Sequence, residues 1–215
     1  MRGKIFQILI SATIALTTFK SSAQGGMKAI TLNQKNLPAG IKYEGKLKKG
    51  LRWTDKNGGN VVITSETGIH RNEKFAHESD GEDAELFAYH YIVKNNKVTT
   101  GWKIYDYISD CPLDITATFT DAAFQITDLN KNGIAEIWIL YKTACSGDVS
   151  PADMKLIMYE NGKKFAMRGT GKALLGIEKG VKQYDGGEYT FDKAFTGAPE
   201  SFRAFAKKLW NANAI

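Results

Sequence analysis

The sequence lacks the short motifs that mark the common classes of enzyme. It has no Gly-x-Ser-x-Gly elbow, no His-Glu-x-x-His, no glycine-rich phosphate loop and no dinucleotide-binding fingerprint. Its three histidines, His70, His77 and His90, do not have the spacing of metal ligands. We expect His70 and His77 to be solvated in a polar loop and His90 to be a satisfied sheet residue. The sequence therefore assigns no reaction.

Long runs of one charge are also absent. No block of five like charges occurs, and basic residues alternate with acids along most of the chain. The formal net charge of +6 falls to +3 when residues 1–23 are left out, because that stretch holds Arg2, Lys4 and Lys20 and no acid. Nucleic-acid binding needs a concentrated basic surface. The even distribution of charge therefore argues against nucleic-acid binding.

Residues 1–23 have the pattern of a cleaved signal peptide. A positively charged start, an apolar run from Ile5 to Phe19 and the small residues Ser21 to Ala23 follow one another. The run is too short, and too often interrupted by Ser and Thr, for a membrane span. We expect export to the periplasm or the medium, with residues 24–215 forming a single β-rich domain without a membrane span.

Only two cysteines occur, Cys111 and Cys145. An even number of cysteines in an exported chain favours a disulfide between them. The bond would close a segment of 35 residues, which stabilises the fold by about 3–4 kcal/mol in the loop-entropy model. The alternative is two separate buried thiols. A two-cysteine metal site is disfavoured, because no histidine or further cysteine lies nearby at zinc-ligand spacing.

The remaining sequence predicts short strands separated by turns. Apolar and aromatic stretches flank three turn signals, at Asp55–Gly59, Asn95–Asn96 and Glu160–Lys163, so each flanking pair is predicted to form a hairpin. Asn161–Gly162 in the third turn is the strongest of these signals. The polar stretch from Glu66 to Glu85 predicts a long surface loop.

Helix is scarce in this sequence. One clear amphipathic stretch runs from about Pro199 to Asn211. Its predicted apolar face consists of Phe202, Phe205, Ala206 and Leu209. The stretches Phe87–Val93 and Ile137–Tyr141 alternate only weakly, which fits either central strands buried on both faces or strands with one aromatic face left exposed. The predicted fold is mainly β, a single domain of antiparallel hairpins with one C-terminal α-helix; periodicity does not separate a sandwich from a barrel or a propeller fragment.

Side-chain oxygens recur at short intervals in the loop before the most hydrophobic strand. They occupy positions 1, 3, 5 and 9 of the loop, and Gly133 occupies position 6. This spacing suits Ca²⁺, which takes 6–8 oxygen ligands around a tight turn. The candidate ligands are the side chains of Asp128, Asn130, Asn132 and Glu136 and the carbonyl of Ile134. The alternative is a metal-free turn, which Asn and Asp stabilise by binding their own backbone.

The Asp128–Glu136 loop resembles the calcium loop of FG-GAP/VCBS-type β repeats. It differs from an EF-hand because position 12 is Ile139 and a strand follows. It also differs from the strongest repeat loops, which carry aspartate where Asn132 stands. The resemblance covers about fifteen residues, and the absence of a second copy argues against a complete propeller. With two carboxylates, the expected dissociation constant for Ca²⁺ is roughly 0.1–1 mM.

A wider resemblance covers nearly the whole chain after the leader. The order of signal peptide, "GLRWTDKNGGNVVITSETG", "SDCPLDI" and "ITDLNKNGIAEIWILYKTACSGDVSPADMKLIMYENGKKFAMRG" is similar to a family of exported proteins from Gram-negative bacteria. That family is described as surface polysaccharide biosynthesis proteins. The resemblance implies a process, such as lipopolysaccharide assembly, and no chemistry.

Aromatic side chains alternate along two neighbouring predicted strands. Phe87, Tyr89 and Tyr91 share one face of the first strand, and Tyr105 and Tyr107 share one face of the second. In a hairpin they would form a platform on which sugar rings stack. The alternative is cross-strand packing inside a β core. The exposure of these side chains distinguishes the two.

Two functions remain in view. The first is an exported, non-enzymatic protein linked to surface polysaccharide biosynthesis, which binds glycan or an envelope protein and is stabilised by calcium. The second is an enzyme that acts on surface polysaccharide through Asp128, Asp148 and Asp153, whose separation in space would decide the matter. No catalytic signature supports the second function, so the first leads.

Overall fold

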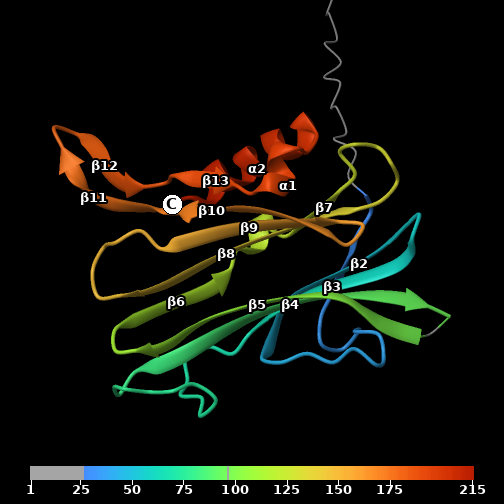
Figure 1. Ribbon diagram of the computed structural model, residues 1–215, viewed down its shortest axis with the longest axis horizontal. Helices are drawn as coiled ribbons and strands as arrows, with labels where there is room; N and C mark the ends of the chain where they lie inside the picture. Colours follow the sequence, from blue (N-terminus) through green and yellow to red (C-terminus); the bar gives the residue numbers. More distant parts are fainter. Residues whose placement is uncertain (1–26, 96) are drawn as a thin grey trace, which may run out of the picture.

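The protein forms two antiparallel β-sheets with helices at its C-terminal end (Figure 1). This architecture comes from a computed structural model that describes residues 27–95 and 97–215. The signal peptide predicted over residues 1–23 lies outside the described residues. Among the described residues, no helix combines the length and apolar character needed to cross a bilayer.

The first sheet contains the N-terminal strands in chain order, each antiparallel to its neighbour. Its members are β1 (Ile30–Leu32), β2 (Lys46–Asp55), β3 (Gly58–Glu66), β4 (Glu82–Lys94) and β5 (Lys97–Cys111). The first two predicted hairpins, β2–β3 and β4–β5, are confirmed. The predicted loop is shorter than expected, since β4 begins at Glu82 rather than near Leu86.

The second sheet has the order β13-β10-β9-β8-β6, and β7 also pairs with β8. Its members are β6 (Asp114–Phe119), β7 (Gln125–Thr127), β8 (Glu136–Ser146), β9 (Asp153–Glu160), β10 (Lys163–Thr170) and β13 (Tyr189–Phe191). The third predicted hairpin is confirmed: Asn161 and Gly162 have φ of 47° and 76°, the positive values that a type I′ turn requires.

A two-stranded arm, one 3₁₀ helix and two α-helices complete the described chain. The arm pairs β11 (Lys172–Glu178) with β12 (Val181–Gly186) and projects beyond the second sheet (Figure 1). The other elements are the 3₁₀ helix η1 (Asp121–Ala123) and the helices α1 (Lys193–Thr196) and α2 (Glu200–Asn213). The predicted C-terminal helix is therefore α2, and the short α1 was not predicted.

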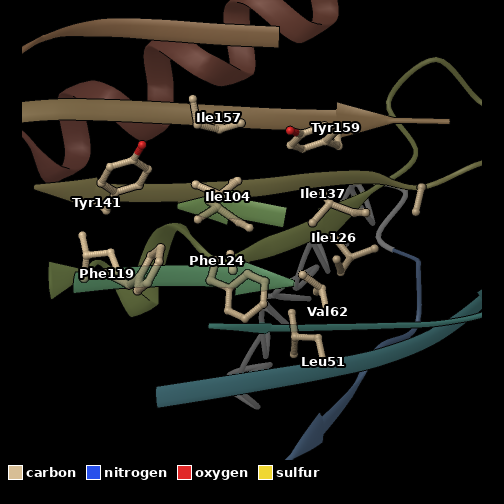
Figure 2. Close-up of a cluster of buried hydrophobic side chains, with 14 of the residues drawn as sticks. Leu51, Val62, Ile104, Phe119, Phe124, Ile126, Ile137, Tyr141, Ile157 and Tyr159 are labelled. Carbon is tan, nitrogen blue, oxygen red and sulfur yellow. The ribbon is translucent and has the colours of Figure 1, made fainter. Parts of the chain in front are cut away.

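The two sheets pack face to face as a sandwich, the first of the alternatives that periodicity left open. Figure 2 shows the buried cluster between them, in which Leu51, Val62 and Ile104 of the first sheet meet Ile137 and Ile157 of the second. Apolar side chains of this kind contribute about 25 cal/mol per Å² of surface removed from water. This shared core is what joins the sheets into one unit.

Both sheets are also covered on their outer faces. Helix α2 packs Phe202, Phe205 and Leu209 against the second sheet, as predicted, together with Trp210. Residues 33–45 cover the outer face of the first sheet. Buried side chains on both faces explain why β4 and β8 alternate so weakly in sequence.

The predicted cysteine pair lies at bonding distance. The Sγ atoms of Cys111 and Cys145 are 1.98 Å apart and the Cα atoms 5.8 Å apart. Cys111 ends β5 and Cys145 lies near the end of β8. The bond therefore ties the edge strand of the first sheet to a central strand of the second.

Candidate functional site

A cavity of about 230 Å³ opens between the two sheets at one end of the sandwich. The β2–β3 turn and the β9–β10 turn meet above it, where Asn57 Nδ2 donates a hydrogen bond to Asn161 Oδ1 at 3.2 Å. Turns from different sheets thus form its rim. We call this cavity the aromatic pocket; the side chains that define it are Trp53, Asp55, Asn57, Asn60, His90, Trp102, Tyr159 and Asn161.

Four rings line the aromatic pocket in a continuous stack. Trp53 and His90 lie 5.9 Å apart between ring centroids, and His90 and Trp102 lie 5.3 Å apart. Trp102 then stacks on Tyr159 at 4.1 Å, with 9° between the planes. The first three rings come from β2, β4 and β5, and Tyr159 comes from β9. The stack therefore crosses from one sheet to the other.

Fixed polar groups surround these rings. Asp55 accepts hydrogen bonds from Trp53 Nε1 (3.1 Å) and from the backbone N–H groups of Asn57 (2.8 Å) and Ala135 (3.3 Å). Asn60 donates through Nδ2 to the Gly58 carbonyl at 2.8 Å. Because both side chains are held by neighbours, their free donors and acceptors are preorganised.

His90 is neutral and carries its proton on Nε2. Asn60 donates through Nδ2 to Gly58, so its Oδ1 is left to accept from His90 Nε2 at 2.9 Å. Burial lowers the pKa of His90 to about 4, against a smaller opposing effect of Asp55. Nδ1 is buried and has no partner among the described residues. His90 is thus half satisfied, where the sequence predicted a satisfied residue.

Gly101 is required beside His90. The β4–β5 register shifts between His90 and Tyr91, and this bulge brings Gly101 over the imidazole. A Cβ at position 101 would lie 2.3 Å from His90 Nδ1, far inside van der Waals contact. Glycine at this position therefore allows the ring to keep its place in the stack.

The predicted calcium loop forms another wall of the aromatic pocket. Ile134 and Ala135 line the cavity. The loop is fastened to the β2–β3 turn, because Lys56 donates its backbone N–H to the Gly133 carbonyl at 2.9 Å and its Nζ to the Asn132 carbonyl. A change in the conformation of this loop would therefore move two residues that line the aromatic pocket.

The candidate ligands of the loop are mostly engaged in turn hydrogen bonds. Asp128 Oδ2 accepts from Gly133 N (3.0 Å), Asn130 Oδ1 from Asn132 N (3.1 Å) and Asn132 Oδ1 from Ile134 N (2.7 Å). Asp128 Oδ1 alone is buried without a partner among the described residues. This free carboxylate oxygen is the feature of the loop that fits a cation.

Glu136 is fully buried and binds the loop backbone. It accepts from Thr127 Oγ1 (2.7 Å) and Leu129 N (2.8 Å). Burial raises the pKa of Glu136, and the charge of Glu160 adds to this, while the hydrogen bonds oppose it. Glu160, which lies opposite Glu136 in the β8–β9 pair, was missed by the sequence interpretation.

Glu160 draws the two loop amides away from a metal-binding orientation. Its Oε1 accepts from Asn130 Nδ2 at 2.5 Å and from Asn132 Nδ2 at 2.8 Å. Within residues 27–95 and 97–215, no group of three or more His, Cys, Asp or Glu side chains has the geometry to hold a metal ion. The unpaired Asp128 Oδ1 supports calcium binding, whereas the orientation of the Asn130 and Asn132 side-chain amides argues against it. Calcium binding by this loop therefore stays a prediction.

The three carboxylates of the enzyme hypothesis are not brought together. Asp148 and Asp153 line one cavity of about 540 Å³, but Asp128 precedes β8 and Asp148 follows it. The 11 residues of β8 span about 35 Å at 3.3 Å per residue. Hydrogen bonds from Ser150 and Ser146 lower the pKa of Asp148 and hold it in a local turn.

The predicted platform of four tyrosines is not a single exposed surface. Tyr89 and Tyr91 are 6% and 3% exposed, under the segment that covers the first sheet. Tyr105 and Tyr107 are 40% and 45% exposed. Lys103 and Lys74 lie over the Tyr105 ring, at 5.3 and 5.1 Å from its centroid. Two of the four tyrosines are therefore buried, and the other two are exposed on β5.

The aromatic pocket itself was missed by the sequence interpretation. Trp53 precedes the first predicted turn, Trp102 follows the second, and Tyr159 lies more than 50 residues further along the chain. A usable signal was present: Asp55, Asn57 and Asn60 cluster directly after Trp53. Their relation to Tyr159 depends on how the two sheets stack on each other, which local sequence pattern does not specify.

Comparisons with protein-family models, curated proteins and solved structures gave no match to this chain.

Proposed function

We propose that this protein binds a glycan, with a sugar ring held in the aromatic pocket, as an exported non-enzymatic component of surface polysaccharide biosynthesis. The observation that carries the proposal is the pocket lining: two tryptophans and a tyrosine beside aspartate and asparagine side chains. Such a mixture of apolar walls and a few convergent polar groups is typical of small-molecule sites.

A sugar ring matches both parts of this lining. Its C–H faces are apolar and pack on aromatic rings, which bury large areas at low entropic cost. Its hydroxyls need neighbouring donors and acceptors, which Asp55, Asn57 and Asn161 supply at the rim. The volume of about 230 Å³ is slightly below the range of about 300–1,000 Å³ for drug-sized ligands. One ring, rather than a whole oligosaccharide, is the appropriate occupant.

Binding is favoured over cleavage at this site. Hydrolysis of a glycosidic bond generally uses two carboxyl groups about 5–9.5 Å apart. Asp55 is the one carboxylate among the described residues that line the pocket, where this chemistry would use two. Burial lowers the pKa of His90 to about 4, so this imidazole stays neutral above about pH 4, and burial raises the pKa of the Tyr159 hydroxyl.

Replacing Trp102 by alanine is expected to weaken glycan binding about tenfold or more, because a central aromatic contact of this kind contributes at least about 1.4 kcal/mol. Trp102 is half-buried, whereas Trp53 is 3% exposed, so Trp102→Ala leaves the fold more nearly intact. Affinity electrophoresis in gels with dextran or polygalacturonate, followed by calorimetry, measures the change.

Tyr105→Ala is the matched control for this experiment. Tyr105 lies on the same strand, β5, and is 40% exposed, but it faces away from the pocket. Its replacement should leave the affinity unchanged. Equal effects of the two substitutions, or no binding of any polysaccharide by the unmodified protein, would refute the proposal. Thermal midpoints measured in parallel separate a binding defect from unfolding.

Calcium binding at the Asp128–Glu136 loop is proposed as a structural support for this site. The spacing of the oxygens and the free, buried Asp128 Oδ1 motivate it. The ion would supply positive charge to the loop, held by Asp128 together with the Asn130, Asn132 and Glu136 side chains and the Ile134 carbonyl. Because Ile134 and Ala135 line the aromatic pocket, the ion would steady one of its walls.

Calcium at 1 mM is expected to raise the thermal midpoint by about 3–6 °C. A dissociation constant near 0.1 mM gives about 1.4 kcal/mol of added stability at that concentration, and a domain of this size gains about 2–4 °C per kcal/mol. Asp128→Ala should abolish the rise, whereas Asp121→Ala in η1 should not. Magnesium should do little. If several millimolar calcium leaves the thermal midpoint of the unmodified protein unchanged, the assignment of a calcium site to this loop is refuted.

A further inference from the structure

A further cavity lies on the second sheet, along the β9, β10 and β13 strands. It measures about 470 Å³ and is lined by Asp153, Lys155, Arg168, Thr170, Glu188 and Thr190. Met154, Met167 and Tyr189 belong to the cluster under helix α2. Alternation along the strands therefore turns Lys155, Arg168 and Thr190 to the opposite face, the one that also carries Tyr159. We call this cavity the charged groove.

Cations are concentrated at one end of the charged groove. Lys155 and Arg168 are direct partners in the β9–β10 pair, and like charges directly opposite one another destabilise a sheet. Lys164 projects from the same face of β10. Burial lowers the pKa of Lys164, and the positive charge of Arg168 lowers it further. Asp106 offsets the charge of Lys155 through an ion pair, and a bound anion would offset the charge of Arg168.

The carboxylates near Arg168 are paired with other residues. Asp106 of β5 forms an ion pair with Lys155 at 2.5 Å. Glu188 Oε2 accepts from Thr170 Oγ1 at 3.3 Å. In the part of the chain that the structure describes, no hydrogen bond or ion pair engages the Arg168 guanidinium. An exposed, unpaired guanidinium in a groove is suited to bidentate binding of a carboxylate or phosphate.

The other end of the charged groove has the opposite character. Asp153 and Glu188 lie there with the Thr170 hydroxyl. Carboxylates accept hydrogen bonds from hydroxyl groups, so this end suits the hydroxyls of a polyol. The charges are thus separated along the groove: basic where an anionic substituent would bind, acidic where hydroxyls would bind.

The charged groove and the aromatic pocket lie along the same face of β10. Tyr159, in the pocket, pairs directly with Lys164. Arg168 lies four residues further along the strand, a distance of about 13 Å at 3.3 Å per residue. A short extended oligosaccharide is long enough to contact both.

We propose that Arg168 forms the centre of an anion-binding subsite for the same glycan, and that the ligand is an acidic polysaccharide carrying carboxylate or phosphate groups. This inference rests on the proposed function for its glycan, but the subsite is defined by its own residues. Lys155 lies beside Arg168 in the groove lining, and Asp153 and Glu188 accept hydroxyls of the neighbouring unit.

Arg168→Gln is expected to weaken binding of polygalacturonate about tenfold and to leave binding of neutral dextran unchanged. It should also make the affinity for polygalacturonate less dependent on salt, because one fewer charge pair forms. Lys207→Gln, the matched control, removes the same charge from exposed helix α2 on the other face of the sheet. It should change neither affinity. Trp102→Ala should weaken binding of both polymers.

A titration with inorganic phosphate tests the subsite without any sugar. The backbone amide resonances of Gly169, Thr170 and Thr190 should shift in the unmodified protein and in Lys207→Gln, and should stay in place in Arg168→Gln. Shifts of equal size around lysines across the whole surface, or no shifts near Arg168, would overturn the subsite.

The outcomes separate the two proposals. Phosphate shifts at Arg168 without binding of any polysaccharide would refute the glycan function and keep the anion subsite. Equal affinity for polygalacturonate in the unmodified protein and Arg168→Gln would refute the acidic ligand, while loss of binding in Trp102→Ala would keep the glycan function. Polygalacturonate and phosphate together distinguish a carboxylate from a phosphate preference.

Discussion

Asp83→Ala is expected to lower the free energy of unfolding by about 3–5 kcal/mol, because a buried donor left without its acceptor costs about 1–3 kcal/mol and Asp83 accepts from three donors. The Asp83 side chain is fully buried on β4. It accepts hydrogen bonds from Asn72 N (2.6 Å), His77 Nε2 (2.9 Å) and Asp110 N (3.0 Å). Alanine would leave three donors without an acceptor, each in a buried or half-buried position.

These bonds hold residues 67–81, the polar strap, against the first sheet. Glu85 accepts from Asn72 Nδ2 at 2.9 Å and pairs with Lys74. Asp110 accepts from the backbone of Glu78 and from Ser79. The strap is therefore fastened mainly by carboxylates of β4 and β5. The exchange of its amide hydrogens should quicken in Asp83→Ala.

Asp80→Ala is the matched control, since Asp80 is an exposed acid of the same strap. Its removal should change the free energy of unfolding by less than about 0.5 kcal/mol. Urea unfolding of both variants measures the difference. If Asp83→Ala costs no more than Asp80→Ala, the carboxylate clamp is not what secures the strap.

The same clamp predicts a loss of stability in acid. Burial pushes the pKa of Asp83 upward, but the hydrogen bonds from Asp110, Asn72 and His77 outweigh it, so the folded-state pKa lies below the ordinary 3.8. The pKa of Glu85 is likewise held below 4.5, where bonds from Lys74 and Asn72 outweigh burial. The stabilisation is complete above these ordinary values and is lost as pH falls through the lower folded-state values.

The polar strap shows where local sequence pattern failed. The stretch from Glu66 to Glu85 predicted a surface loop because it is polar and contains Gly68, Gly81 and a cluster of acids. Asp83 and Glu85 instead lie near the start of β4, and hydrogen-bond donors, most of them from the strap, compensate for their burial. His77, expected to be solvated, has a side chain only 7% exposed. Hydrogen bonding that cancels the cost of burying a charge leaves no periodic signal in sequence.

Elements whose signal is local were predicted well. The Asn161–Gly162 turn and the apolar face of α2 depend on short-range chemistry, and both appear in the structure. The pairing of Trp102 with Tyr159 depends on the stacking of two sheets, so neither residue was chosen in advance. Tyr89 and Tyr105 were placed on the correct strand face, but residues 33–45, which cover Tyr89, could not be foreseen.

Loss of the Cys111–Cys145 bond is expected to lower the free energy of unfolding by about 3–4 kcal/mol. The bond spans a sequence separation of 34 residues, and the loop-entropy model gives this magnitude for a closed loop of that size. The enclosed segment contains β6, η1, β7 and most of β8. Without the bond, the unfolded chain gains freedom over a segment that supplies a large part of the second sheet.

The Cys111–Cys145 bond also helps to hold β5 against the second sheet. β5 is the edge strand of the first sheet, and besides the disulfide it meets the second sheet through the Asp106–Lys155 ion pair and the Trp102–Tyr159 stack. Cys145→Ser should therefore loosen the end of β5 at Cys111 first. Intact mass with and without reductant and alkylating agent establishes whether the bond forms in protein isolated from cells.

Reduction of the unmodified protein provides the comparison for Cys145→Ser, because both break the bond while only the substitution changes a side chain. Urea midpoints of the two should agree and should lie well below that of the oxidised protein. The trapping of two free thiols in protein recovered from its native compartment would contradict the prediction. Equal midpoints with and without reductant would show that packing between the sheets, and not the covalent link, holds β5 to β8.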